Sequence, residues 1–149
     1  MKRELLIAYL DHYLRISEID DYGPQGLQVE TANDEVHRVA LAVDVSPAII
    51  ETAVAWQADL LLVHHGILWR SVERIAGPLG TRVRLLMKHG LNLYAAHLPL
   101  DAHPEVGNNA VLARLFGMEI SNCSLTKDIY KYSGLALPKV YVCFLPFHF

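Results

Sequence analysis

The sequence predicts an α/β fold, a layered sheet of mostly parallel strands flanked by helices, and three observations support this class. Short apolar runs at residues 39–43, 60–63 and 91–96 are bounded by turn or polar residues, as is typical of buried strands. Segments with a helical pattern of apolar residues separate these runs, and the connections between them are short. Strands and helices that alternate in this way form parallel sheets covered by helices.

The N-terminal region predicts a helix, a loop and a short strand before the first buried strand. Apolar residues recur at helical spacing over residues 3–16, with charged residues between them. Residues 20–26 are rich in turn-forming types, so we expect a loop that serves as a surface connection. A short strand is expected at residues 27–29.

Capping residues mark the helix boundaries in the rest of the chain. Ser46 followed by Pro47 predicts the start of a helix, because serine is a favoured N-cap and proline suits the first helical position. Gly90 and Gly117 predict the ends of two later helices, since glycine readily adopts the left-handed conformation that follows a helix.

The sequence changes character near residue 121. We therefore expect an α/β domain at residues 1–120 and an atypical tail at residues 121–149, consistent with a truncated or frame-shifted product. The tail ends in a strongly apolar segment, residues 139–149, which resembles an edge strand but contains Pro146.

Composition excludes several classes of protein. A chain of 149 residues fits one ordinary domain. The net charge of −3 and the scattered basic residues do not form a basic stripe, so nucleic acid is not indicated. No apolar run approaches the roughly 20 residues that cross a bilayer. Two cysteines form no disulfide framework, and a cytoplasmic location is expected.

Histidines follow two of the predicted strands. His64 and His65 come directly after the second buried strand, and His97 follows the third, with Asp101 four positions later. Because the carboxyl ends of neighbouring parallel strands meet at one edge of a sheet, we expect these side chains to converge. Imidazole and carboxylate groups are ligands of zinc, iron and manganese, so the sequence predicts a divalent metal site.

The adjacency of His64 and His65 constrains that site. Successive side chains of a strand point to opposite faces, so the two histidines would reach two ions, about 3.5–4 Å apart and bridged by Asp101. The alternative is structural: His64 caps the strand and His65 faces solvent. His103 is a candidate for the outer shell of the site. The remaining histidines are expected at the surface or at helix ends: His12, His37, His89 and His148.

Four segments carry a resemblance to a known family. They are Val-His-His-Gly at 63–66, the segment 97–104 with its Asp-Ala-His-Pro, Gly-Asn-Asn at 107–109, and the loop and strand at 21–29. In this combination and order they resemble the NIF-three-like family of dinuclear-metal proteins. Many bacterial members are named GTP cyclohydrolase 1 type 2 homologues. The family commonly has asparagine where this chain has Gln25.

The resemblance implies a metal centre and an assembly. His64, His65 and Asp101 would be metal ligands, and His97 would lie beside the site. The family implies two divalent ions per subunit and a hexamer built from trimers. Its members are longer, and their second α/β half supplies a His-x-x-x-Glu pair. No histidine of this sequence has a glutamate four positions later.

Three functions follow from the sequence and the resemblance. The first is a metal-dependent hydrolase of a small nucleotide-like substrate, with no catalytic residue assigned. The second is a metal-binding or interaction protein without catalysis, and the third is an inactive, truncated remnant. The sequence contains no Gly-rich phosphate loop, no G-x-S-x-G elbow and no Cys-x-x-Cys motif, so the chemistries of those motifs have no support.

Overall fold

The computed structural model describes residues 1–69 and 74–118, and the chain divides into two compact units, Met1–Leu98 and Pro99–Phe149. The first unit contains, in chain order, α1 (Arg3–Tyr13), the 3-10 turn η1 (Ile16–Glu18), β1 (Gly26–Val29), β2 (Val39–Ala42), α2 (Pro47–Ala55), β3 (Leu60–Val63), α3 (Gly77–His89) and β4 (Asn92–Ala95). The helix α4 (Leu98–Ala102) begins at the last residue of this unit, and α5 (Asn108–Leu115) lies in the second unit.

The four strands form one sheet in the order β1-β4-β3-β2. Strands β2, β3 and β4 are parallel, and β1 runs antiparallel along the outer edge of β4. Ala42 pairs with Val63, and Val63 pairs with Ala95, so the three parallel strands end at the same level. The predicted α/β class with a mostly parallel sheet is confirmed, and the residues that follow these strands share one edge of the sheet.

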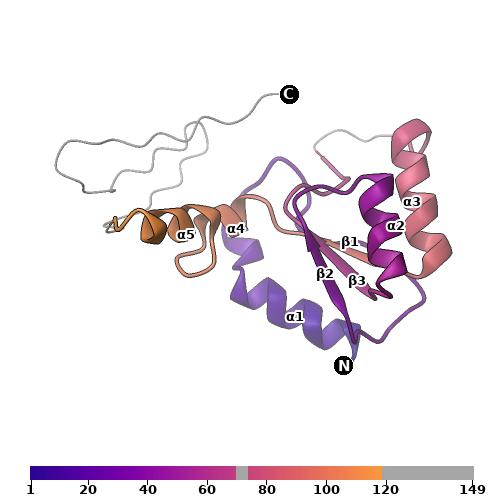
Figure 1. The fold of residues 1–149 in the computed structure, drawn as a ribbon, viewed down its shortest axis with the longest axis horizontal. Helices are drawn as coiled ribbons and strands as arrows, with labels where there is room; N and C mark the ends of the chain where they lie inside the picture. Colours follow the sequence, from indigo (N-terminus) through magenta and orange to yellow (C-terminus); the bar gives the residue numbers. More distant parts are fainter. Residues whose placement is uncertain (70–73, 119–149) are drawn as a thin grey trace. The chain divides into compact units, whose positions relative to one another are not determined.

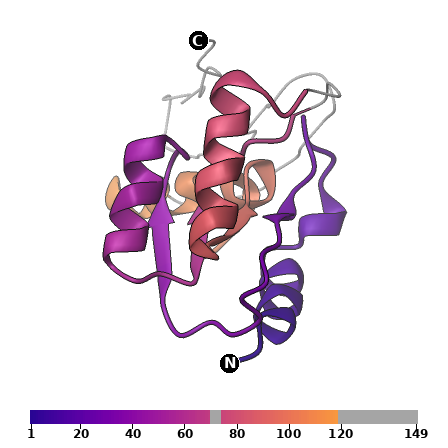
Figure 2. The same ribbon diagram turned by 90° about the vertical axis from the view of Figure 1, so that its right-hand side faces the viewer.

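Helices α2 and α3 cover one face of the sheet (Figures 1 and 2). Alternate residues of β3 and β4, such as Leu61 and Leu93, point to this face and pack with Ile50 and Leu86 in the main hydrophobic core. Each helix connects two neighbouring parallel strands, as expected for consecutive β-α-β units. The opposite face of β4 presents Tyr94, whose hydroxyl contacts a residue of α1.

The predicted capping residues act as expected. The Ser46 hydroxyl accepts a hydrogen bond from the amide of Ile49 at 3.3 Å, and Pro47 is the first residue of α2. Gly90 follows α3 with a φ of 64°, a left-handed conformation that glycine adopts without steric cost.

Some details differ from the prediction. Helix α1 ends at Tyr13, and its apolar stripe is only partly covered: Leu5 and Tyr9 are 60% and 59% exposed. The helix contacts the sheet chiefly through β1 at its edge, which leaves one side of the stripe uncovered. Helix α4 was not expected. The predicted boundary near residue 120 and the predicted edge strand at 139–149 lie outside the described residues.

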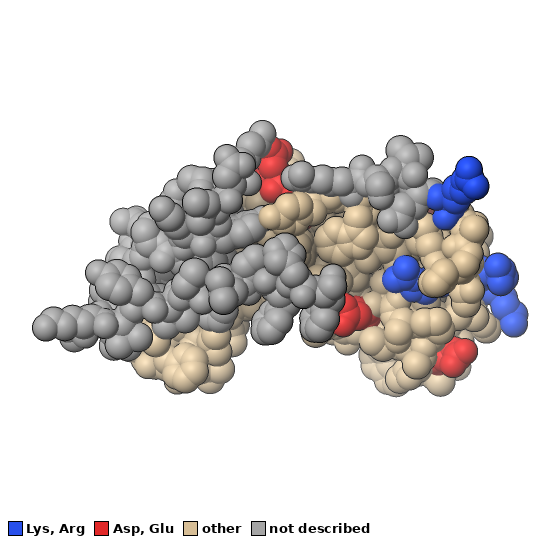
Figure 3. Space-filling view, turned by 90° about the horizontal axis from the view of Figure 1, so that it is seen from above, with Lys and Arg blue, Asp and Glu red and all other residues tan. Residues whose placement is uncertain are grey.

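The basic residues of the described surface are scattered, as the sequence indicated. On the face shown in Figure 3, the lysine and arginine side chains stand apart from one another, with uncharged surface between them. No helix in the described part of the chain has the length and apolar character needed to cross a membrane.

Candidate metal centre

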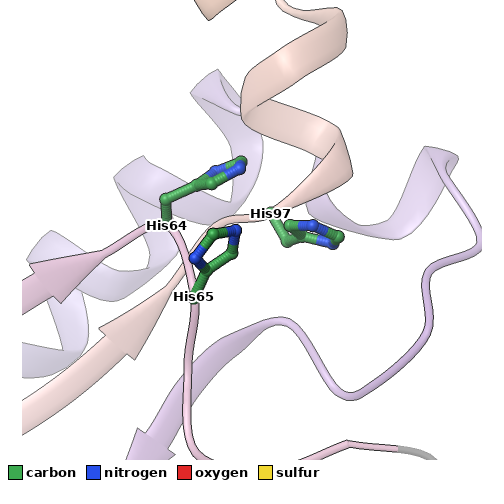
Figure 4. A group of neighbouring side chains, drawn as sticks. All are labelled: His64, His65 and His97. Atoms are coloured by element: carbon green, nitrogen blue, oxygen red, sulfur yellow. The ribbon is translucent and has the colours of Figure 1, made fainter. Parts of the chain in front are cut away.

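Three histidines meet at the carboxyl ends of β3 and β4. His64 and His65 follow β3 directly, and His97 lies two residues beyond β4. The ring centroids are 4.6 Å apart for His64 and His65, 4.8 Å for His64 and His97, and 5.5 Å for His65 and His97. One ligand nitrogen from each ring lies within 4.8 Å of the other two. Figure 4 shows the three rings side by side, two from one strand end and one from its neighbour. We call these residues the histidine cluster.

The side chains of His64 and His65 can both join the cluster because the regular strand β3 ends at Val63. The amides of His64 and His65 both donate to the carbonyl of Val43, at 3.1 and 2.8 Å. A regular parallel strand would not send two successive amides to one acceptor, so the chain bends here. The alternation that would separate the two side chains is therefore interrupted. Gly66 follows, and a Cβ at this position would collide with the side-chain amide of Gln28.

Each ring of the cluster is oriented through its Nδ1 atom. The contacts are His64 Nδ1 with the Ala96 carbonyl oxygen at 3.1 Å, His65 Nδ1 with Asp44 Oδ1 at 2.8 Å, and His97 Nδ1 with Asp21 Oδ1 at 2.9 Å. Carbonyl and carboxylate oxygens can only accept, so Nδ1 carries the proton in each neutral ring and the lone pair resides on Nε2. Metal-binding histidines in proteins are held in this way.

Residues 21–28 hold His97 in place. The side chain of Asp21 is only 1% exposed, and its second oxygen accepts the Leu98 amide at 2.8 Å. Gln25 Oε1 accepts the amide of His97 itself, at 2.6 Å. Both the ring and the backbone of His97 are thus fixed from a segment more than 70 positions away in sequence.

The same segment also holds the loop after His65. Gln28 Oε1 accepts the amides of Ile67 and Leu68, at 2.7 and 3.3 Å, and its Nε2 donates to the Pro24 carbonyl at 2.7 Å. Residues 20–26 thus form a partly exposed loop, as expected, but the loop also holds His97 through Asp21 and Gln25. Composition identified a loop correctly but carried no information about its long-range hydrogen bonds.

The histidine cluster fits a divalent ion. Three imidazoles with their lone pairs on Nε2 are the ligand set of sites that keep a fourth position open for water or substrate. Nitrogens around a tetrahedral zinc ion lie about 3.4 Å apart, given Zn–N distances of about 2.1 Å. The nitrogens here lie within 4.8 Å of one another, so modest ring movements would bring them to one ion.

Asp101 and His103 lie in the second unit, and their predicted place at the site stays a prediction. Within that unit, Asp101 Oδ1 accepts the side-chain amide of Asn108 at 2.8 Å, and its carbonyl accepts that of Asn109 at 2.9 Å. The Gly-Asn-Asn motif therefore orients Asp101. His103 Nδ1 accepts the amides of Glu105 and Val106, both at 3.2 Å, which gives this ring a local role in the turn.

The sequence predicted His64 and His65 as ligands with His97 beside them, and the structure brings the three rings together. The assignment of ligands among them stays a prediction. The sequence pattern indicated no role for Asp44, which lies two positions after β2, as His65 lies after β3 and His97 after β4. It assigned no role to Asp21, Gln25 and Gln28, which the resemblance included only as part of a matching segment.

The fold and the cluster define an α/β domain that presents three oriented histidines at the carboxyl end of its sheet. The chain belongs to the Duf34/NIF3 (NGG1p interacting factor 3) family, whose model matches residues 1–136.

Curated relatives carry the name "GTP cyclohydrolase 1 type 2 homolog". The protein of that name from Pyrococcus abyssi is 47% identical over 119 residues, which cover 80% of this chain and 47% of the relative. The one from Vibrio cholerae is 50% identical over 114 residues, or 76% of this chain and 45% of the relative. The chain thus spans about half the length of the curated relatives it matches.

Solved structures show the same fold over the same part. A structure titled "Structural genomics, protein ybgI, unknown function" superimposes with a TM-score of 0.77 at 41% identity, covering 81% of this chain and 49% of that one. The crystal structure of TTHA1606 from Thermus thermophilus gives 0.76 at 45% identity, covering 85% and 52%.

Proposed function

We propose that this chain contributes His64, His65 and His97 to a divalent metal centre of a metal-dependent hydrolase that acts on a small, nucleotide-like substrate. The observation that carries the proposal is the convergence of three imidazoles, each fixed through Nδ1 by an acceptor of the protein. The names of the curated relatives support the substrate class. Asp101 completes the proposed ligand set.

A divalent ion held at this place would supply Lewis acidity for the activation of water near neutral pH. Residues of this chain orient the histidines that would hold the ion. Asp21 keeps the His97 ring in one tautomer, and Asp44 does the same for His65. Imidazole ligands favour zinc or iron, and a carboxylate from Asp101 would extend the range to manganese. Asp101 would supply a carboxylate ligand if the centre held two ions per subunit, as in the family.

A non-catalytic metal-binding protein is the second candidate, and one observation favours it. Two carboxylates that contact the cluster, those of Asp21 and Asp44, are engaged with histidine rings. A general base for hydrolysis would then have to come from outside this set. We also propose, from the family alone, a cytoplasmic homohexamer.

Metal analysis combined with a hydrolase screen tests the proposal. The full chain is loaded with zinc, iron or manganese, and release of products from a panel of nucleotides is measured for the wild type, His64→Ala and Asp101→Ala. His37→Ala is the control, because its side chain is 70% exposed and lies outside the cluster. We expect bound metal and turnover that both variants lose and the control keeps. Activity that neither variant changes would contradict the hydrolase.

The other outcomes separate the remaining candidates. Metal that raises the melting temperature without any turnover would indicate the binding protein, since a ligand of the folded state stabilises it by mass action. A chain that binds no metal and forms no defined oligomer would indicate the inactive remnant.

A further inference from the structure

Two aromatic side chains flank the histidine cluster, and the metal centre does not use them. The Trp69 ring lies 5.4 Å from that of His97, nearly perpendicular to it at 87°, and 6.4 Å from that of His65. The Tyr22 ring lies 6.3 Å from that of His97, tilted by 53°. The two aromatic residues come from different loops, and each contacts the ring of His97.

The backbone positions of both aromatic residues are fixed. A Cβ at Gly23 would collide with the Leu68 carbonyl and crowd the Cα of Trp69, so the two loops pack backbone to backbone. This approach requires glycine. Gln28 fixes the second loop further by accepting the amide of Leu68. The backbone segments that carry the two rings are therefore held together beside the cluster.

Their exposure separates these rings from core aromatics. Tyr94 is fully buried, and its hydroxyl donates to Asp11 at 2.8 Å. In contrast, Tyr22 is 40% exposed and Trp69 is only partly buried. Aromatic surface that stays accessible beside a polar cluster is typical of ligand sites, where it contacts the flat part of the ligand.

We propose that Trp69 and Tyr22 bind a planar heteroaromatic ring, and that the ligand of the metal centre is therefore a nucleoside-like compound rather than a sugar or an open-chain molecule. This inference rests on the proposed function and adds the residues that select the substrate. Aromatic side chains stack on the faces of bases with little dependence on the base, so the two residues set the class of ligand.

Equilibrium dialysis of the zinc-loaded full chain tests the inference, with guanosine as the flat probe and ribose as its sugar-only counterpart. We expect the wild type to retain guanosine and not ribose. Trp69→Leu and Tyr22→Leu should each weaken guanosine binding by roughly tenfold, in line with the loss of one stacking partner. Trp69→Phe keeps a flat ring and should restore most of the affinity. Zinc affinity, measured separately, should stay unchanged in all three variants.

Trp56→Leu is the matched control, because Trp56 is an exposed tryptophan at the end of α2 whose ring faces Arg38 and not the cluster. It should bind guanosine as the wild type does. Circular dichroism checks each fold, and if Trp69→Leu unfolds, Tyr22→Leu decides the question, since Tyr22 is 40% exposed.

The two proposals fail in different ways. Zinc binding with equal retention of guanosine and ribose, or with guanosine affinity unchanged in every folded leucine variant at positions 22 and 69, would overturn the ring site and leave the metal centre standing. A wild type that binds no zinc would overturn the metal centre. Guanosine binding that still depended on Trp69 would then uphold the ring site alone.

Discussion

At the amino ends of β3 and β4 the polar side chains bond to one another and to the backbone, whereas at the carboxyl ends they hold three imidazoles in one cluster. Asn92 is the centre of the amino-end network and is fully buried. Its Oδ1 accepts from the amide and hydroxyl of Thr31 and from Arg3, at 3.0, 3.2 and 3.2 Å. Its Nδ2 donates to the carbonyls of Asn33 and Asp59, at 3.0 and 3.1 Å.

The two ends differ in what their hydrogen bonds achieve. Every polar atom of the Asn92 side chain is used inside the protein, so this network contributes to stability and offers nothing to a ligand. At the other end, the hydrogen bonds fix the orientation of three imidazole rings that lie close together. Imidazoles arranged in this way can serve as ligands of a divalent cation. Substitutions at the amino ends of the strands should therefore lower stability, and substitutions at the carboxyl ends should weaken metal binding.

The largest effect is expected for Asn92→Ala. The substitution leaves the Thr31 amide without its buried acceptor. It also removes one hydrogen bond to each of the Asn33 and Asp59 carbonyls, which keep the Arg3 side chain and the backbone amide of residue 92 as donors. Together these losses should lower the free energy of unfolding by roughly 3 kcal/mol. Urea unfolding of the metal-free chain measures it. Asn92→Asp keeps the acceptor but points a second oxygen at the carbonyls of Asn33 and Asp59, so it should also be destabilised. An unchanged midpoint in Asn92→Ala would contradict the assigned role.

His65→Ala should weaken metal binding and leave stability almost unchanged. The His65 side chain is 42% exposed and its partner Asp44 is 64% exposed, so truncation should change the unfolding free energy by no more than about 0.5 kcal/mol. Zinc affinity, measured by chelator competition, should fall on the order of 100-fold, because one of the nitrogen ligands is gone. His37→Ala is a matched control, as another exposed histidine beside an exposed carboxylate. Equal zinc affinity in the two variants would contradict the cluster.

Asp21→Asn tests the orienting hydrogen bond without removing a ligand. The amide can accept from His97 or from the Leu98 amide but cannot replace both carboxylate oxygens. Loss of such an outer partner weakens metal binding by roughly 10–100-fold. Asp44→Asn, at a much more exposed carboxylate, should weaken it less. The reverse order would show that burial of Asp21 does not matter for the site.

Much of this architecture follows from local sequence patterns. The runs that became β3 and β4 are largely apolar because most of their residues are buried. The run that became β2 is apolar as well, although it lies at the edge of the sheet and its Leu41 is 75% exposed. Ser46, Pro47 and Gly90 set helix boundaries through their own backbone and side-chain preferences. The expectation that His97 lies near His64 and His65 required only that the two strands before them be parallel neighbours, which the alternation of strands and helices already indicated.

The features that the sequence did not predict depend on contacts between residues that are distant in the chain. Asp21 lies 76 positions from His97, and no periodic pattern connects them. A turn-rich segment reads as a surface loop whether or not its carboxylate is buried, so the burial of Asp21 had no local signal. Asn92 was likewise expected only as one residue of an apolar strand, although it is the polar centre of the opposite end. Position in the fold, rather than residue type, separates the two roles.

A smaller, pH-dependent effect is expected at the amino end. Burial raises the pKa of the Asp59 carboxyl, but hydrogen bonds from the amides of His37 and Arg38 and from the Asn33 side chain outweigh it, so the pKa lies below its ordinary value. This stabilisation is complete above the unfolded pKa of about 3.9 and is lost as pH falls through the folded pKa. The melting temperature of chelator-treated protein, measured from pH 6 to pH 3, should therefore fall more steeply with pH for the wild type than for Asp59→Asn.

The smallest effect is expected for Asp34→Asn, also near the amino end. A hydrogen bond from Lys2, at 2.9 Å, lowers the pKa of the Asp34 carboxyl, and the same pair raises the pKa of Lys2. The sign of the pH effect is thus the same as for Asp59. Both partners are solvent-exposed, however, so added salt should screen the pair, whereas it should hardly affect the backbone bonds to Asp59. In 0.5 M sodium chloride, a salt level at which the screening length is only about 4–5 Å, we expect the pH dependence of Asp34→Asn to match that of the wild type while Asp59→Asn still differs. Persistence of both differences would show that the exposed pair stabilises the fold as the bonds to Asp59 do.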